Sequence, residues 1–274
     1  MPGVRTMLFN SLEFHFIAAN GRPVRSPIPL HVLRGLFMNI IKIVDPSLAS
    51  ATHDAETMSA YAIQLQVSRE NVFLTFNLFS KALNDAVKDF IVQQDDLKFN
   101  IGRLETLLVK VAVSRIDAGK IVDDAVPLDK FKIIFKTPTF LKSEGNVILF
   151  PAPDTVLKHL AHAWNELVPG FEPIDENALS AWAKMNARVR SYRLETASVN
   201  LGEGARSNTG FIGWAKFAIK SDDNDEDFSR ISDRLLHFAE YTNIGGGRTT
   251  GLGAIRYLPS TGARKSFNHD DTTG

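Results

Sequence analysis

The chain has 274 residues, of which 44% are hydrophobic and 23% are charged, as is typical of a soluble globular protein large enough for two domains. It contains 0 cysteines, so disulfides and thiolate metal sites are excluded, and a reducing cytoplasm is the expected location. The 31 basic residues balance 31 acidic ones, and because a basic face can survive a neutral total, this balance neither requires nor excludes a nucleic-acid partner. The most apolar stretch near the start is interrupted by Arg34, Asn39 and Lys42, which indicates an amphipathic helix and no membrane span.

The first half of the chain predicts four strands and two helices. Alternating apolar residues indicate strands, and apolar residues at helical spacing indicate helices, the first of which ends at Asp45-Pro46. The order is β-α-β-β-α-β, the ferredoxin-like unit. The expected spans are 6–18 (strand), 30–44 (helix), 59–67 and 71–79 (a hairpin), 80–92 (helix) and 107–116 (strand).

The second half repeats this order with one inserted helix. An Asp-rich stretch over residues 117–129 is expected to be a linker, so we place the boundary near residue 120, between domains 1–120 and 121–274. The predicted class is α+β, with tandem ferredoxin-like (RNA-recognition-motif-like) domains, inferred from element order only. The expected spans are 131–135 (strand), 154–167 and 176–185 (helices), 187–199 and 210–219 (strands), 228–241 (helix) and 252–258 (strand).

A glycine-rich loop lies between the last helix and the last strand. Five of the nine residues from Gly245 to Gly253 are glycine, a composition that can leave backbone amides open to an anion. Nucleotide-binding loops run from strand to helix, whereas this loop runs from helix to strand, so a nucleotide site is not expected. The loop could also be a helix C-cap followed by a turn, but Arg248, Thr249 and Thr250 favour contact with phosphate or ribose.

Four blocks, in order along nearly the whole chain, carry a resemblance. At these residues the chain resembles the CRISPR repeat-RNA endoribonucleases of the repeat-associated mysterious protein superfamily. Each block is weak alone, and their order and spacing make them strong together. They are residues 29–54, which end in His53-Asp54; residues 135–142 with 150–153 and the following helix; Gly210-Phe211-Ile212-Gly213-Trp214; and the glycine loop with the preceding residues 236–241.

The resemblance implies a fold, a reaction and partners. Members of the family fold as tandem ferredoxin-like domains, bind the repeat of the precursor transcript and cut it once per repeat. The nucleophile is the RNA's own 2′-hydroxyl, so no metal or other cofactor is needed, and the products carry 2′,3′-cyclic phosphate and 5′-hydroxyl ends. The implied partner is CRISPR repeat RNA, with effector-complex subunits and a second copy of the chain as further candidates.

His53 matches the family's catalytic histidine by position. A histidine suits proton transfer because its unperturbed pKa lies near the operating pH. The family's best-known pattern also has a tyrosine on the first helix and a lysine after the histidine, where this chain has Met38 and Ser59. We expect Lys42 or Arg34 to supply the missing positive charge, although a solvated helix face is an equally good reading of both.

Arginines of the strand 187–199 are the expected RNA contacts. By strand alternation Arg188 and Arg190 share one face with Tyr192, which suits a track of phosphates, and Arg193 is a further candidate. An exposed face that only keeps the protein soluble is the alternative. The glycine loop is expected to cradle the RNA backbone nearby, through Gly245, Gly246, Gly247, Arg248, Thr249, Thr250 and Gly251.

Other chemistry has little support in the sequence. His159, His162 and Glu166 lie on one face of a predicted helix, but with no further ligand evident they are more simply surface or core residues. Two competing readings stay open. One is a relative that binds repeat RNA in an effector complex without cutting it, which Met38 and Ser59 favour, and the other is a structural ferredoxin-like protein without an RNA role.

Overall fold

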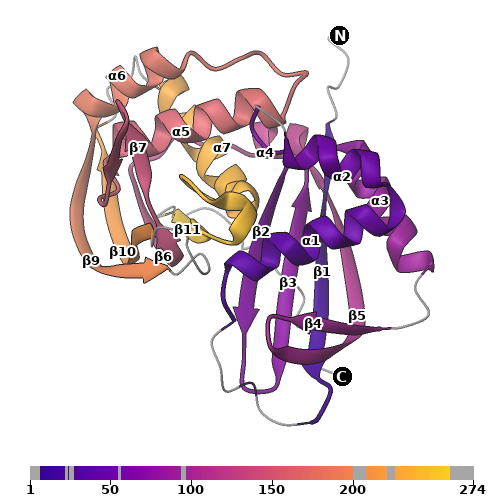
Figure 1. Ribbon diagram of the computed structural model, residues 1–274. Helices are drawn as coiled ribbons and strands as arrows, with labels where there is room; N and C mark the ends of the chain where they lie inside the picture. Colours follow the sequence, from indigo (N-terminus) through magenta and orange to yellow (C-terminus); the bar gives the residue numbers. More distant parts are fainter. Residues whose placement is uncertain are drawn as a thin grey trace, which may run out of the picture.

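The protein is described by a computed structural model that covers residues 7–21, 24, 28–54, 57–93, 97–199, 208–220 and 226–259. Two antiparallel sheets lie side by side, each with helices packed on one of its faces (Figure 1). A third, two-stranded ribbon extends from the second half. The predicted α+β class with tandem ferredoxin-like domains is confirmed.

The first sheet has the strand order β2-β3-β1-β5-β4. Without the short β4, this is the ferredoxin-like order, in which the first and third strands of the unit are central neighbours. The alternation that predicted β1 is visible in its burial, with Leu12, Phe14 and Phe16 fully buried. The elements are β1 (Leu8–Ala18), α1 (His31–Val44), α2 (Pro46–His53), β2 (Tyr61–Val67), β3 (Asn71–Leu78), α3 (Lys81–Gln93), β4 (Lys98–Ile101) and β5 (Leu104–Asp117).

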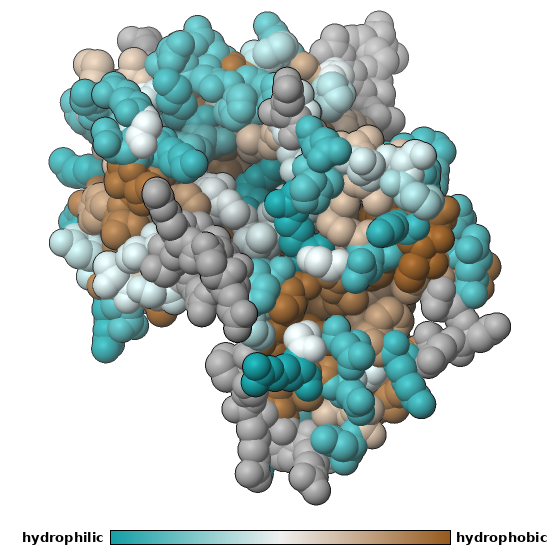
Figure 2. Space-filling model, in the orientation of Figure 1, coloured by the Kyte–Doolittle hydropathy of each residue, from teal (hydrophilic) through white to brown (hydrophobic). Residues whose placement is uncertain are grey.

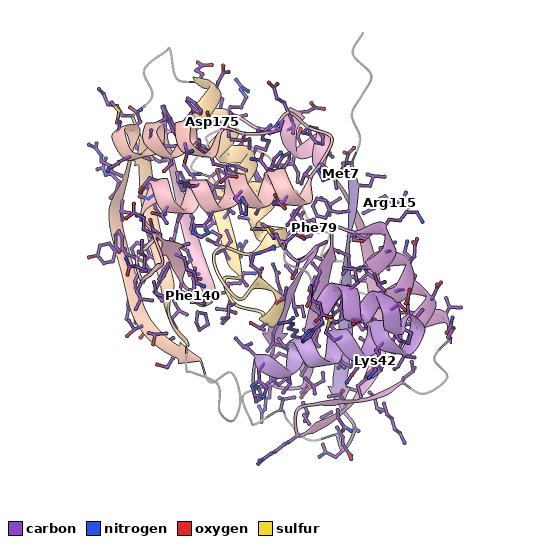
Figure 3. The ribbon with its side chains drawn as sticks, turned by 45° about the horizontal axis from the view of Figure 1, so that its top comes forward. Met7, Lys42, Phe79, Arg115, Phe140 and Asp175 are labelled. Atoms are coloured by element: carbon purple, nitrogen blue, oxygen red, sulfur yellow. The ribbon has the colours of Figure 1, made fainter. Side chains whose placement is uncertain are left out.

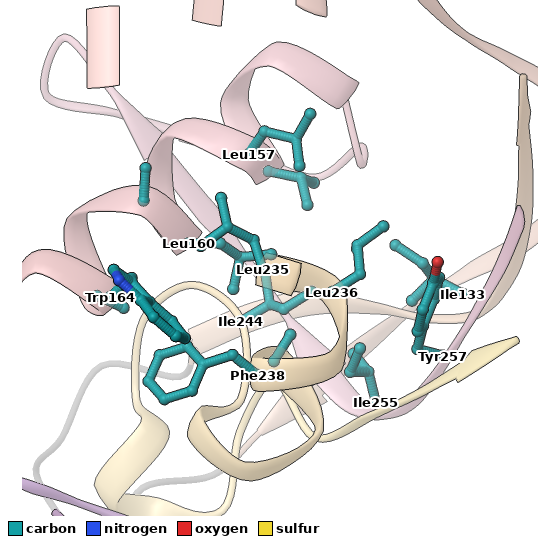
Figure 4. Close-up of a cluster of buried hydrophobic side chains, with 14 of the residues drawn as sticks. Ile133, Leu157, Leu160, Trp164, Leu235, Leu236, Phe238, Ile244, Ile255 and Tyr257 are labelled. Atoms are coloured by element: carbon teal, nitrogen blue, oxygen red, sulfur yellow. The ribbon is translucent and has the colours of Figure 1, made fainter. Parts of the chain in front are cut away.

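The second sheet has the strand order β11-β6-β10-β9, the same topology as the first. The elements are α4 (Ala118–Asp123), β6 (Lys130–Thr139), β7 (Leu141–Ser143), β8 (Asn146–Ile148), α5 (Pro153–Leu167), α6 (Glu176–Asn186), β9 (Ala187–Val199), β10 (Asn208–Ile219), α7 (Glu226–Thr242), the 3-10 turn η1 (Arg248–Thr250) and β11 (Ile255–Pro259). Its helical face packs α5 against α7, where the ring centroids of Trp164 and Phe238 lie 5.2 Å apart (Figure 4).

Three local features differ from the prediction. Asp45-Pro46 ends α1 and also begins a second helix, because the Asp45 carboxylate accepts a hydrogen bond of 2.9 Å from the Leu48 amide and proline suits the first helical turn. The expected linker 117–129 contains α4, whose N-terminus is capped by the Asp117 carboxylate. The expected domain boundary near residue 120 falls within this helix. The short strands β4, β7 and β8 were not predicted, since three or four residues give too little periodicity.

One hydrophobic cluster spans the two halves, a second belongs to the first half alone, and polar contacts also join the halves. Phe79, which follows β3 (Figure 3), lies 5.6 Å from Phe238 of α7 between ring centroids. Phe9 of β1 belongs to the same cluster. Gln64 of β2 donates to the Glu240 carbonyl at 2.6 Å, at the end of α7. The C-terminal end of α7 is therefore fixed against the first sheet.

The surface in this orientation is mostly polar, with small apolar patches, and it is hollowed between the two halves (Figure 2). Polar side chains line this hollow. No helix of the described residues is long and apolar enough to cross a membrane.

Candidate functional site

Tyr61, the first residue of β2, is the buried centre of a polar cluster that lies against α1. Its ring stacks on Phe37 with 4.2 Å between centroids, and its hydroxyl donates to the sulfur of Met38 at 3.9 Å. The same hydroxyl is hydrogen-bonded to the side chains of Arg34 and Thr249. Burial raises the pKa of Tyr61, while the positive charge of Arg34 opposes that shift, so the phenol is neutral at neutral pH. A tyrosine within an alternating strand is typical of core packing, which is why its sequence context did not single it out.

Arg248 lies inside the same cluster and is only 8% exposed. Its guanidinium donates to the Thr242 carbonyl at 3.0 Å and to the Ser59 carbonyl at 3.2 Å, so it joins α7 to the segment before β2. Burial lowers the pKa of Arg248 to about 10. A cation therefore lies beside Ser59, one of the two positions where the expected positive charge is missing, but its hydrogen bonds are largely used within the protein.

The glycine loop is a packed turn that touches both halves. Gly245 and Gly253 have positive φ, and a Cβ on either would collide with a backbone carbonyl, of Phe140 and Ile244 respectively. A Cβ on Gly251 would lie 3.1 Å from Leu33 of α1, so the loop lies directly against that helix. The glycines are needed for this close packing as well as for the turn.

Some amides of the loop donate to backbone carbonyls, and others have no backbone acceptor among the described residues. The amides of Gly246, Thr250, Gly251, Leu252 and Gly253 donate to backbone carbonyls. Those of Gly247, Arg248 and Thr249 find no backbone acceptor within the described part of the chain. Gly247 is left-handed and precedes the right-handed turn η1, a sequence of conformations that makes a small anion-binding concavity.

His53 is the last residue of α2 and is 65% exposed at its side chain. Its Nδ1 lies 3.0 Å from Asp54 Oδ1, and Asp54 also accepts a hydrogen bond of 3.2 Å from Ser50. The hydrogen bond from His53, and then that from Ser50, holds the pKa of Asp54 below its usual value. A proton on Nδ1 directed at Asp54 leaves Nε2 as the acceptor, which is the tautomer required of a general base.

The two candidate cations of α1, Arg34 and Lys42, differ in their surroundings. Arg34 is partly buried and bonded to Tyr61. Lys42 lies on the last turn and is exposed, and no carboxylate of the described residues lies within ion-pair distance of it (Figure 3).

The arginines of β9 lie on the second sheet, apart from this cluster. A β-bulge interrupts the alternation, since Val189 pairs with Phe217 and Ser191 with Lys216, which leaves Arg190 as the extra residue. Tyr192 consequently points to the helical side, where its ring lies 5.4 Å from Phe150. The expectation that Tyr192 shares a face with Arg188 and Arg190 is therefore wrong, and Arg193 takes that place.

The histidines of α5 do not converge on a shared ligand. His159 Nε2 lies 2.7 Å from the Lys142 carbonyl, while His162 Nδ1 lies 3.0 Å from Glu176 Oε1. No group of three or more His, Asp or Glu in the described segments is arranged to hold a metal ion.

The amino-acid sequence of the chain is similar to those of known proteins. The model of the family "CRISPR-associated endoribonuclease Cas6" matches residues 133–255. Cas6 of Mycobacterium tuberculosis is 33% identical over 130 residues, which is 47% of this chain but 39% of that protein's own length. Cas6 of Streptococcus thermophilus is 24% identical over 221 residues, covering 79% of this chain and 87% of that one. The resemblance to the CRISPR repeat-RNA endoribonucleases is confirmed.

Solved structures of Cas6 proteins share the fold. A Cas6 product complex superposes with a TM-score of 0.75 at 19% identity, covering 92% of this chain and 99% of that one. Thermus thermophilus Cas6 does so with a TM-score of 0.69, also at 19% identity and with the same coverage. At this level of identity the likeness describes the fold alone.

Proposed function

We propose that this chain is an endoribonuclease that binds CRISPR repeat RNA and cuts the precursor transcript once in each repeat. The attack comes from the RNA's own 2′-hydroxyl, without a metal, and leaves 2′,3′-cyclic phosphate and 5′-hydroxyl ends. The observation that carries the proposal is His53, whose Nδ1 faces Asp54 and whose ring is largely exposed. Two of the structurally similar Cas6 proteins were solved as a product complex and as a substrate mimic complex.

His53 is the proton-transfer residue of this proposal. Nε2 accepts the proton of the attacking 2′-hydroxyl, and the resulting imidazolium is stabilised by the Asp54 carboxylate. The same proton can then reach the leaving 5′-oxygen. The reaction in this form conserves protons and needs no bound ion.

Arg34 and Lys42 are the cations proposed to stabilise the negative charge that develops on the phosphate. A preorganised cation stabilises such a charge best, because it does not have to reorient during the reaction. Arg34 meets this condition, since the Tyr61 hydroxyl holds it, whereas Lys42 is exposed and acts as a mobile charge. Tyr61 is buried, so we assign it a positioning role and not contact with the RNA.

The RNA backbone is proposed to follow two surfaces of the protein. The first is the glycine loop from Gly245 to Gly251, where the amides of Gly247, Arg248 and Thr249 have no backbone acceptor among the described residues and could donate to a phosphate. The second is the row of arginines on β9, Arg188, Arg190 and Arg193, all of which are exposed. A cytoplasmic location, other effector-complex subunits and a second copy of the chain stay predictions.

Two RNAs test the reaction. The protein is incubated in EDTA with a cognate repeat RNA and with the same RNA carrying 2′-deoxyribose at the scissile nucleotide. We expect cutting of the first and not of the second, with loss of cutting in the His53→Ala variant. Cutting of the deoxy substrate, or dependence on an added divalent ion, would overturn the mechanism.

A binding role without cleavage is the second candidate. Met38 and Ser59 favour it, because neither side chain can donate a proton strongly or carry a positive charge. Tight binding of the repeat RNA with no cutting of either substrate would select this function.

A further inference from the structure

The second sheet has one face covered by helices and one face without a helix. Residues of β6 and β10 alternate between them, so that Phe131, Ala215 and Phe217 enter the core. Lys132, Trp214 and Lys216 point to the other face. The register places Lys216 between Lys132 and Ser191, and Trp214 between Ile134 and Arg193. An aromatic ring therefore lies on a central strand, with basic residues on both neighbouring strands.

The indole of Trp214 is partly exposed and is flanked by two ammonium groups. Lys132 Nζ lies 4.9 Å and Lys216 Nζ 5.6 Å from the ring centroid. Both distances are within the range of about 6 Å for a cation–π contact, so the lysines fix the orientation of the ring. Two like charges held beside one ring repel each other, and an incoming anion relieves that repulsion.

The two lysines that flank Trp214 also line a hollow on the sheet. It has a volume of about 700 Å³ and is lined by Lys130, Phe131, Lys132, Arg190, Ser191, Lys216, Phe217, Leu258 and Pro259. Four of these residues are basic and none is acidic. No carboxylate among the described residues forms an ion pair with these four, so their charge is available to a ligand.

We propose that this face binds a single-stranded stretch of RNA, with one base stacked on Trp214 and the adjacent phosphates paired with Lys132 and Lys216. Stacking on an indole requires an unpaired base, because a duplex hides its bases from a side chain on a flat sheet. The basic hollow fits a polyanion, and stacking on an indole does not depend on which base is present, so binding is tolerant of sequence. The inference rests on the proposed function in that the stretch belongs to the same transcript as the repeat.

The test uses the whole chain and a labelled decamer of uridine, which forms no duplex. Trp164 and Trp182 are 1% and 7% exposed, so quenching of tryptophan fluorescence by the decamer reports on Trp214. We expect Trp214→Ala to weaken binding by about tenfold and to abolish the quenching, while Trp214→Phe keeps binding within about threefold. Unchanged affinity of the alanine variant, with its circular dichroism intact, would overturn the proposal.

A pair of lysine variants separates this face from a general effect of charge. Lys132→Gln/Lys216→Gln is expected to reduce the slope of log affinity against log salt by about 1.4, at about 0.7 for each lost phosphate contact. The matched double variant Lys88→Gln/Lys158→Gln removes the same charge from α3 and α5, on the helical faces, and is expected to leave the slope unchanged. Equal slopes for the two double variants would count against the proposal.

Cleavage of the repeat RNA is measured in parallel, so that the two proposals can fail separately. If the wild-type protein cuts the repeat but binding of the decamer does not depend on Trp214, the proposed binding face is refuted and the proposed endoribonuclease function is supported. If the protein does not cut the repeat, and the decamer still quenches the fluorescence of Trp214, the proposed binding face is supported and the proposed endoribonuclease function is refuted.

Discussion

The hydroxyl of Tyr61 and the sulfur of Met38 lie 3.9 Å apart, although the two residues belong to β2 and α1. Met38 occupies the helix position at which the family pattern has a tyrosine. The phenol thus reaches the same face of α1 from a neighbouring strand. Its hydrogen bonds to Arg34 and Thr249 connect the helix with the glycine loop of the other half.

Removing this hydroxyl tests whether it positions Arg34. Tyr61→Phe keeps the ring on Phe37 but leaves Arg34 without its partner. We expect single-turnover cleavage of repeat RNA to slow by about tenfold, since a hydrogen bond to a charged group contributes about 1.5–3 kcal/mol. Affinity for the 2′-deoxy RNA should stay unchanged, because the loss affects positioning and not contact. Tyr192→Phe, which removes an exposed hydroxyl, is the matched control, and an equal slowing in both variants would contradict the assignment.

Substitutions of His53 and Asp54 are expected to reduce the cleavage rate to different degrees. His53→Ala removes the base and should lower the single-turnover rate by about 10²–10⁴-fold. Asp54→Asn keeps the size of the side chain but loses the charge that orients the imidazole, so a smaller loss of about tenfold is expected. If Asp54→Asn were as inactive as His53→Ala, the carboxylate would have a direct part in the reaction.

Substitution of the β9 arginines is expected to change the salt dependence of RNA binding more than the rate of cleavage. The triple variant Arg188→Gln/Arg190→Gln/Arg193→Gln should lower the slope of log affinity against log salt by about 2 for repeat RNA. Cleavage at saturating RNA should report whether the fold of the site is intact. An unchanged slope would mean that β9 is a solvated edge without RNA contact.

Ionisation of Glu240 is expected to make the free energy of unfolding depend on pH. Burial raises its pKa, while its Oε1 accepts a hydrogen bond of 3.1 Å from the Tyr257 amide. Because the pKa is raised in the folded state, the stabilisation from this group is complete below its unfolded value and is lost as the pH rises through the folded value. Glu240→Gln keeps an acceptor but cannot ionise. Its free energy of unfolding in urea, relative to wild type, should therefore rise from pH 4.5 to pH 7.5, and a constant difference would exclude this linkage.

The sequence predicts the long elements well and the site only in part. Regular periodicity was enough for α1, α5, the hairpin of β2 and β3, and the strands β9 and β10, and the element order was enough for the topology. The bulge at Arg190 could not be foreseen, because an extra residue in a strand leaves no mark on the alternation until the partner strand is known. The burial of Arg248 depends on carbonyls of Thr242 and Ser59 that folding alone brings together. Tyr61 was missed for the same reason.

Asn243 shows how far the two halves depend on each other. It is 1% exposed, and its amide nitrogen donates to carbonyls of Ile63 in the first sheet and Leu252 in the glycine loop, each at 3.0 Å. The last strand of the first sheet ends at Asp117, well before Asn243 in the sequence. Until α7 has been made, Phe9 and Phe79 lack their contacts with Phe238, and Tyr61 lacks its contact with Thr249 of the glycine loop. Because α7 and the glycine loop follow every strand of the first sheet in the sequence, the contacts that join the two halves form only after both have been synthesised.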